Sequence, residues 1–307
     1  MDEIFTELSG LITESRNPAS LEIDLMNTED IVRLINKEDH KVAPAVAQEI
    51  PRIIQAVDLI YDALRQGGRL FYIGAGTSGR IGVLDAVECP PTFGSDPQLI
   101  QGIIAGGTAS LVQAQEGSED NSEQGSADIR ERGINARDVV CGLAASQRTP
   151  YVIAALQEAK KRGAKTIFIN CNPPGDIKVQ ADILICPVPG PEVIMGSTRM
   201  KAGSAQKMVL NIITTAVMIK SGKVYENMMI DLQQNSKKLV ERSKKIIMIA
   251  TGVSYEQAQN YLKQAGGQVK SAIVMAITNL DLKTVQKMLA KNDGFIKKAL
   301  NEWRSGK

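Results

Sequence analysis

The 307-residue chain is poor in the residues that usually carry metal, redox and nucleic-acid chemistry. It has a single histidine, His40, and four scattered cysteines without a Cys-x-x-Cys spacing, which leaves almost no ligands for a metal. Aromatic residues make up 4% and the formal net charge is +2, so neither a base-stacking platform nor a nucleic-acid-binding surface is expected. No apolar run reaches the roughly 20 residues that span a bilayer. We therefore expect no metal, no nucleic-acid partner and no membrane partner.

The cysteines and the start of the chain also bear on the compartment. Three of the cysteines, Cys141, Cys171 and Cys186, lie in or beside expected strands, and Cys89 stands apart. Buried free thiols in a reducing compartment are expected rather than disulfides. The start, Met1–Ile4, is acidic and amphipathic, unlike a secretory signal peptide. The expected location is the cytoplasm.

Short apolar segments alternate with helix-length segments through the middle of the chain. The expected strands are Leu70–Ile73, Leu99–Ile104, Val139–Leu143, Thr166–Ile169 and Ile183–Cys186. This alternation predicts an α/β fold, with a five-stranded parallel sheet covered by helices on both faces. Ligands of such sheets bind at the carboxyl ends of the strands, near a topological switch point.

Helical patterns flank this region on both sides. Asn27 is expected to cap a helix, a second helix should cover 45–64, and another should run from about 200 to 220. Beyond these, the Lys-rich stretch 233–245 indicates a linker helix, followed by a three-helix bundle. The expected divisions are an N-terminal helical segment (1–48), an α/β domain (49–225), and the linker helix with the C-terminal bundle (226–307).

Three Gly- and hydroxyl-rich segments predict a phosphorylated small molecule as the ligand. They are Gly74–Gly79, Ala144–Thr149 and Gly196–Lys201. The first leads from a strand into a helix start, where backbone N–H groups and the helix dipole favour an anion. Arg199, Lys201 and Lys207, near the third, could bind phosphate or could form a basic surface strip.

Gly74, Gly76 and Gly79 also match the dinucleotide-binding pattern G-x-G-x-x-G. That fingerprint needs a carboxylate at the end of the second strand to hold a ribose. The second expected strand here ends in Ala105-Gly106-Gly107, and Asp96 precedes it. A phosphate monoester therefore suits this loop better than a dinucleotide.

Without a useful histidine, proton transfer is expected to fall to carboxylates. Pro90 and Pro91 are expected to end the helix that begins near Ser78, which would leave Glu88 at its C-terminal end. The negative pole of the helix would raise the pKa of Glu88 and suit it to acid–base work. The alternative is an exposed helix-end acid. The acidic cluster Glu116–Asp120 is either a solvated face or the source of a second acid–base group.

Six segments, in this order, resemble the N-acetylmuramic acid 6-phosphate etherases, bacterial enzymes of cell-wall sugar recycling. They are residues 74–80, 88–94, 104–107, 116–120, 148–152 and 196–207. The Glu-Cys-Pro-Pro and Gly-Ser-Thr-Arg-Met-Lys blocks are the most specific. The resemblance extends from Thr13–Asn17 to the last helix.

This resemblance implies a sugar isomerase (SIS) fold, a three-layer sandwich, and removal of D-lactate by elimination followed by hydration. It implies Glu88 and Glu119 as the catalytic pair, no cofactor, and a homodimer. By similarity to sugar-phosphate isomerase domains, the phosphate or substrate would contact Thr77, Ser78, Ser146, Thr149, Ser197, Thr198 and Lys201. The alternatives are a non-catalytic sugar-phosphate sensor, which would not need the glutamates, and an aldose–ketose isomerase.

Two positions depart from the pattern of the family. Gln147 stands where glycine is usual in the Ser-Gly-Arg-Thr loop, and Met195 stands where threonine is expected. A side chain at position 147 is penalised if the loop needs a positive φ. We expect retained activity with a higher KM.

Overall fold

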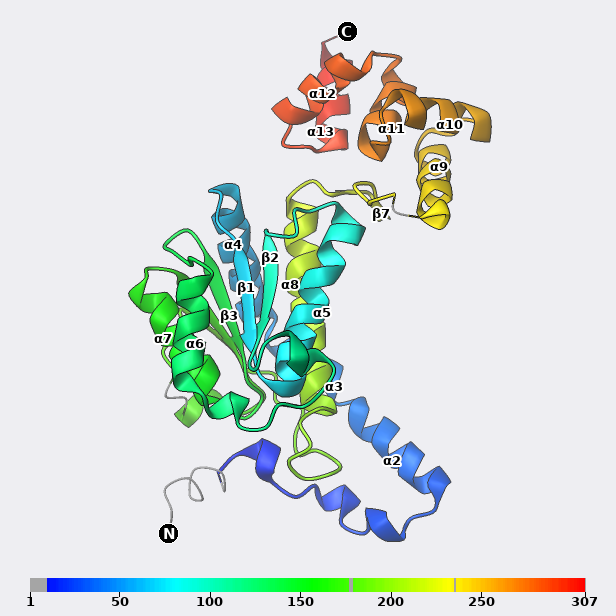
Figure 1. Cartoon of the computed structure of the whole chain (residues 1–307). Helices are drawn as coiled ribbons and strands as arrows, with labels where there is room; N and C mark the ends of the chain where they lie inside the picture. Colours follow the sequence, from blue (N-terminus) through cyan, green and yellow to red (C-terminus); the bar gives the residue numbers. More distant parts are fainter. Residues whose placement is uncertain (1–9, 177–178, 235, 307) are drawn as a thin grey trace. The chain divides into compact units, whose positions relative to one another are not determined.

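Five parallel strands organise most of the chain in the computed structural model, which describes residues 10–176, 179–234 and 236–306 (Figure 1). They are β1 (Leu70–Gly74), β2 (Ile100–Ile104), β3 (Val139–Leu143), β4 (Lys165–Ile169) and β5 (Ile183–Ile185). The spatial order is β2-β1-β3-β4-β5, and every pairing is parallel. The predicted strands and the five-stranded parallel sheet are confirmed. Met1–Ile4, on which the signal-peptide argument rests, lies outside the described residues.

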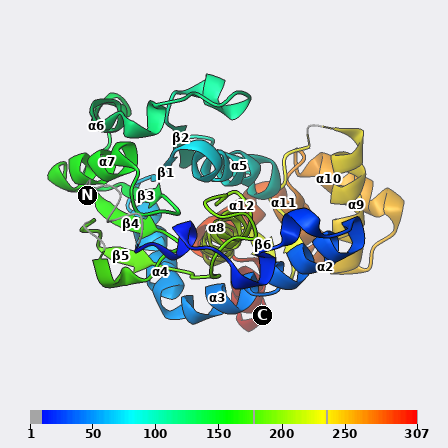
Figure 2. The same cartoon turned by 90° about the horizontal axis from the view of Figure 1, so that it is seen from below.

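Helices cover both faces of this sheet, as the apolar strands require (Figure 2). On one face, α6 (Ser122–Glu131) and α7 (Pro150–Lys161) share a buried cluster with Phe71, Ile73 and Val140 of the sheet. The other face carries α4 (Ile50–Arg65) and the first parts of α5 (Gly76–Phe93) and α8 (Lys201–Lys220). The result is the three-layer sandwich that the sequence predicts.

The N-terminal helices differ in one respect from expectation. Asn27 caps α2 (Thr28–Asp39) by accepting from the Asp30 N–H, as predicted. The single helix expected over 45–64 is two helices, α3 (Val42–Gln48) and α4, which meet at Glu49. Pro51 explains the break, because it has no N–H to continue α3 toward the carbonyl of Ala47 and is favoured in the first turn of a helix. Short 3₁₀ turns, η1 (Ile12–Glu14), η2 (Pro18–Ser20) and η3 (Ile23–Leu25), precede α2.

The chain divides into two compact units, which we describe separately. The first contains the residues up to Val87 and Gln98–Thr214, and the second contains Glu88–Pro97 and Thr215–Lys307. These limits differ from the three divisions expected from the sequence, which stay a prediction. None of the helices in the described residues is both long and apolar enough to cross a membrane.

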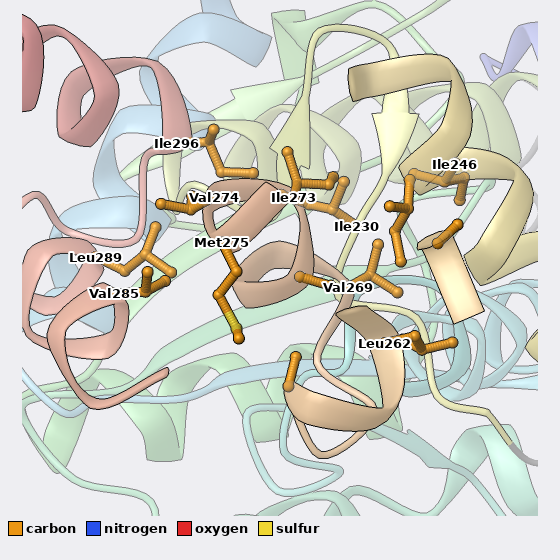
Figure 3. Packing of buried hydrophobic residues seen from close by; sticks show 14 of the residues in the cluster. Ile230, Ile246, Leu262, Val269, Ile273, Val274, Met275, Val285, Leu289 and Ile296 are labelled. Atoms are coloured by element: carbon orange, nitrogen blue, oxygen red, sulfur yellow. The ribbon is translucent and has the colours of Figure 1, made fainter. Parts of the chain in front are cut away.

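The second unit is built from a short hairpin, β6 (Val224–Tyr225) and β7 (Met228–Met229), and from helices. The helices are α9 (Lys237–Thr251), α10 (Tyr255–Gln264), α11 (Val269–Thr278), α12 (Leu282–Lys291) and α13 (Ile296–Ser305). Their apolar faces form one buried cluster around Ile273 and Val274 (Figure 3). Four helices follow α9, where the sequence predicted three. The missed break is at Asn279, whose left-handed φ of 60° ends α11, and at Asp281, which caps α12.

The helix that carries Glu88 does not stop where it was expected to stop. Pro90 and Pro91 lie inside α5, which continues to Phe93. Proline supplies a helical φ, so the helix persists even though the carbonyls of Ala86 and Val87 lose their bonding partners. Glu88 is therefore not at the C-terminal end of its helix, and the sequence prediction that placed it there was wrong.

Candidate functional site

The carboxyl ends of β1 and β3 lie side by side, in register at Gly74 and Leu143. The order β2-β1-β3-β4-β5 has its topological switch point between these two strands. Each strand leads into a helix start, with Gly76 beginning α5 and Pro150 beginning α7. The first turn of an α-helix leaves N–H groups without helical partners and carries partial positive charge. Two such ends at one switch point form an edge suited to an anion.

Two glycines allow the first turn of α5 to lie directly on the end of β1. A Cβ at Gly79 would lie 2.7 Å from both the Gly74 carbonyl oxygen and Ile104 Cγ1. A Cβ at Gly74 would lie 2.7 Å from the Gly79 nitrogen. The G-x-G-x-x-G spacing here therefore serves the close packing of helix on strand.

Thr77 and Ser78 lie in this first turn and are half-buried. Ser78 Oγ donates to Gln206 Oε1 of α8 at 2.8 Å. Thr77 also faces α8, since a Cβ at Gly203 would lie 3.4 Å from Thr77 Cγ2 and 3.5 Å from the Thr198 carbonyl oxygen. The structure therefore brings Thr77 and Ser78 close to Thr198, which lies three residues before the start of α8.

Ser146 and Thr149 lie in the loop from β3 to α7. Thr149 is the N-cap residue of α7 and is 8% exposed, and its side chain makes no capping hydrogen bond. Between them, Gln147 has a φ of 65°, the left-handed conformation that favours glycine. Its Nε2 donates to Asn170 Oδ1 at 2.9 Å and to the Pro173 carbonyl at 3.0 Å. The expected positive φ is confirmed, and the side chain ties this loop to the one after β4.

The start of α8 is already occupied by a carboxylate of the chain itself. Glu192, 1% exposed, accepts from the N–H groups of Lys201 at 3.0 Å and Ala202 at 2.9 Å. Burial raises the pKa of Glu192, although these two N–H groups and the Lys201 charge act in the opposite direction. The N-terminus of α8 is thus capped by a side chain of the protein itself, whereas Thr149 makes no capping hydrogen bond at the start of α7.

Lys201 is engaged as well. Its Nζ, on a residue 1% exposed, lies 2.7 Å from Glu38 Oε2. Burial raises the pKa of Glu38, but hydrogen bonds from Lys201, Lys41 and Asn17 outweigh it and lower the pKa to about 2. The ammonium group that the sequence assigned to a ligand therefore forms a buried ion pair in the structure. Ser197 and Thr198 are half-buried in the preceding loop.

The N-terminal segment supplies partners that residue patterns did not predict. The Thr13 N–H and hydroxyl bond to the side chain of Asn172, which also donates to the Ala145 carbonyl. Asn17 donates to Glu38 Oε2 and to the Pro191 carbonyl. The segment thus lies against the loops that follow β3, β4 and β5. Only the Thr13–Asn17 motif in the sequence signalled its importance.

Glu119 lies in the 3₁₀ turn η5 (Ser118–Asp120) and is exposed. Its neighbour Ser118 lines a cavity of about 400 Å³ beside the end of β2. Gly106, Gly107 and Arg132 line the same cavity. Glu119 therefore stands near the carboxyl edge of the sheet, in the first unit.

Glu88 is exposed on α5 and belongs to the second unit, whereas Glu119 belongs to the first. The block that follows it is held by the segment after β7. The Gln233 N–H donates to the Pro91 carbonyl at 3.4 Å, and a Cβ at Gly94 would lie 2.1 Å from the Asp231 carbonyl oxygen. The Pro-Pro-Thr-Phe-Gly sequence thus has a packing role beside any role of Glu88.

The four cysteines are all buried. Burial raises the pKa of the Cys141 and Cys171 thiols, which makes both weak nucleophiles. Among the described residues, no group of three or more His, Cys, Asp or Glu side chains is placed to hold a metal ion.

Comparison with known proteins identifies two family matches and close full-length relatives. Residues 52–160 match the glucokinase regulatory protein N-terminal SIS domain, and residues 125–216 match the SIS domain. N-acetylmuramic acid 6-phosphate etherase of Salinibacter ruber is 50% identical over 97% of this chain and 96% of its own length. The protein of that name from Clostridium acetobutylicum is 54% identical over 96% of this chain and 98% of its own.

A solved phosphoheptose isomerase from Neisseria gonorrhoeae superposes with a TM-score of 0.47 at 16% identity. The superposition covers 62% of this chain and 97% of the isomerase chain.

Proposed function

Because the chain belongs to the N-acetylmuramic acid 6-phosphate etherases, we propose that it cleaves the D-lactyl ether of N-acetylmuramic acid 6-phosphate. The observation that carries this proposal is the identity of about half of all residues over nearly the whole chain with proteins of that name. The products are N-acetylglucosamine 6-phosphate and D-lactate. The enzyme is a carbon–oxygen lyase of peptidoglycan sugar recycling.

The phosphate is proposed to bind at the adjacent N-termini of α5 and α7. Thr77, Ser78, Ser146 and Thr149 supply hydroxyl groups there, and the two helix ends supply N–H groups and positive potential. Ser197 and Thr198 extend this set from the loop before α8. Lys201 has a supporting role, because its ion pair with Glu38 ties the start of α8 to α2.

The reaction is proposed to proceed by elimination and hydration on the open-chain aldehyde. A carboxylate removes the C2 proton, the electron pair forms the C2–C3 double bond, and the C3–O bond breaks. Lactate leaves with a proton from the second carboxyl group. Water then adds at C3 and a proton returns to C2, so one water is consumed per lactate released. Glu88 and Glu119 are the proposed acid–base pair.

A homodimer and a cytoplasmic location complete the proposal. Within the first unit, Leu84 and Val87 of α5 are 51% and 57% exposed, and Ile212 of α8 is 41% exposed. The two helices are neighbours, because Asn211 Nδ2 donates to Asp85 Oδ1 at 2.6 Å. Apolar side chains left exposed on adjacent helices support contact with a second copy. The buried thiols suit a reducing compartment.

The proposal is tested by incubating the protein with N-acetylmuramic acid 6-phosphate in ¹⁸O-labelled water. We expect unlabelled lactate and an ¹⁸O atom at C3 of the sugar, since the ether oxygen leaves with lactate. Label in the hydroxyl of lactate would contradict C3–O cleavage. Saturable binding without lactate would indicate a sensor, and a ketose product would indicate an isomerase.

The two glutamates are separated by exchange at C2. In D₂O, deuterium enters C2 of N-acetylglucosamine 6-phosphate only if the C2 base is present. We expect Glu88→Gln and Glu119→Gln each to lower lactate release by about 100-fold or more. The variant that also loses C2 exchange identifies the base. Glu116→Gln, from the same acidic cluster as Glu119, is the control and should retain both activities.

A further inference from the structure

The hydrogen bond between Ser78 and Gln206 joins the first turn of α5 to α8 at the proposed phosphate site. Ser78 Oγ donates to Gln206 Oε1 at 2.8 Å. Gln206 is 0% exposed. Its Nε2 has no hydrogen-bond partner among the described residues. A fully buried amide that uses only its oxygen is unusual, because an unpaired buried N–H is costly.

The polarity of this bond matters for an anion. A phosphate monoester dianion only accepts hydrogen bonds, whereas a serine hydroxyl has a single proton to donate. While Ser78 donates to Gln206 Oε1, its proton is not available to the phosphate. If the proton turned to the phosphate alone, the Ser78 oxygen would face a carbonyl oxygen at hydrogen-bond distance, which is repulsive.

We propose that Gln206 is a positioning residue that reverses its amide and thereby makes Ser78 a donor to the phosphate. Rotation of the terminal amide by about 180° presents Nε2 to Ser78 Oγ, which can accept while donating its own proton onward. The amide N–H then donates to the Ser78 hydroxyl, and the hydroxyl donates to the phosphate. In such a series of hydrogen bonds each bond polarises the next. This inference rests on the proposed phosphate site.

The buried setting makes Gln206 suited to this role. In the free protein each orientation of the amide leaves one of its two polar atoms unpaired, and the observed orientation also gives the Ser78 proton an acceptor. In the reversed orientation the unpaired atom is a carbonyl oxygen, which structures tolerate better than an unpaired N–H. The arriving phosphate therefore selects the orientation in which the amide nitrogen gains a partner.

The test is a double-mutant cycle on binding of N-acetylglucosamine 6-phosphate, measured by calorimetry. Gln206→Met removes the amide at similar length, and we expect about 10-fold weaker binding. Gln206→Glu can only accept from Ser78 and adds negative charge, and we expect about 100-fold weaker binding. In a Ser78→Ala background, Gln206→Met should change affinity by less than about 2-fold. Turnover by Gln206→Met should show a raised KM with nearly unchanged kcat.

A 10-fold effect of Gln206→Met that persists in the Ser78→Ala background would overturn the inference, as would unchanged affinity in Gln206→Met. Thermal melting of each variant shows whether it is folded. If Gln206→Glu does not fold, the double-mutant cycle of Gln206→Met with Ser78→Ala is sufficient to test the inference. The binding measurement does not depend on turnover, so the role of Gln206 and the etherase function are tested independently. Absence of lactate release by the unmodified protein would contradict the etherase function, and absence of coupling would contradict the role of Gln206.

Discussion

At the scale of single residues, Gln147 shows how a side chain can offset an unfavourable backbone conformation. A left-handed φ costs a non-glycine residue about 1 kcal/mol. Two hydrogen bonds from the Gln147 amide, to Asn170 and to the Pro173 carbonyl, act against that cost. The loop therefore keeps its conformation without glycine. These hydrogen bonds, which residue patterns did not predict, act against the loop distortion from which we expected a higher KM.

We expect Gln147→Ala to be less stable than Gln147→Gly by about 1 kcal/mol, because both variants lose the hydrogen bonds and only alanine keeps the backbone strain. Gln147→Gly loses the bonds but also the strain, so its free energy of unfolding should lie within about 1 kcal/mol of the unmodified protein. Urea unfolding measures both. Equal stability of the two variants would show that φ at this position is not restrictive.

Glu88 and Glu119 illustrate the limit of residue-scale reasoning. Their neighbouring sequences single them out, and both are exposed in the structure. The argument that proline would place Glu88 at a helix end was wrong, because α5 continues through Pro90 and Pro91. Their assignment as an acid–base pair stays a proposal that the C2 exchange experiment tests.

At the scale of elements, the start of α8 depends on two buried carboxylates from distant segments. Glu192 caps the first N–H groups, and Glu38 of α2 pairs with Lys201. Breaking a buried ion pair costs about 3–5 kcal/mol when one partner remains buried and charged. The N-terminal segment, through Asn17 and Glu38, is thereby tied to the helix that carries Gln206.

This pairing predicts a pH dependence of stability. The pKa of Glu38 is about 2 in the folded chain against an ordinary value of 4.5. The unfolded chain therefore binds more protons between these values, so the stabilisation is complete above pH 4.5 and is lost as the pH falls toward 2. Glu38→Gln should lower the free energy of unfolding at pH 7 by about 3 kcal/mol.

Denaturant unfolding at several pH values checks this prediction, and the difference between the two proteins should shrink as the pH approaches 2. The matched control is Glu29→Gln on the same helix, whose pair with Arg33 is exposed. Exposed pairs contribute about 0.5 kcal/mol or less, so this variant should be nearly neutral. A pH-independent difference for Glu38→Gln would rule out ionisation of Glu38 as the cause.

At the scale of the whole molecule, the proposed homodimer makes a separate prediction. Leu84→Asp and Ile212→Asp place charges on apolar side chains of α5 and α8 that are exposed in the single chain. If these helices contact a second copy, each variant should sediment as a monomer, because a buried unpaired charge is costly. Val32→Asp on α2, 59% exposed, is the control and should leave the dimer intact.

Analytical ultracentrifugation at several concentrations distinguishes these outcomes. Unchanged sedimentation of both variants would exclude this face as the interface, and a monomeric unmodified protein would exclude the dimer itself. Activity measured alongside shows whether the site needs the second copy.

The sequence by itself determined the strands and a helix start directly after the first of them, and it singled out the segments that we propose for phosphate. These features depend on residues a few positions apart, so local patterns predict them. It also determined that carboxylates, rather than histidine or metal, are the candidates for proton transfer. The resemblance to a family followed from short motifs in their order.

The tertiary structure alone decided which of these groups are free and which are already bound. Lys201 and Glu38 are 163 positions apart, and Ser78 and Gln206 are 128 apart, so no local pattern could pair them. The same holds for Glu192 at the start of α8 and for the side chain of Gln147. A buried polar group must find a partner wherever the fold supplies one, and only the packing of distant segments determines which partner that is.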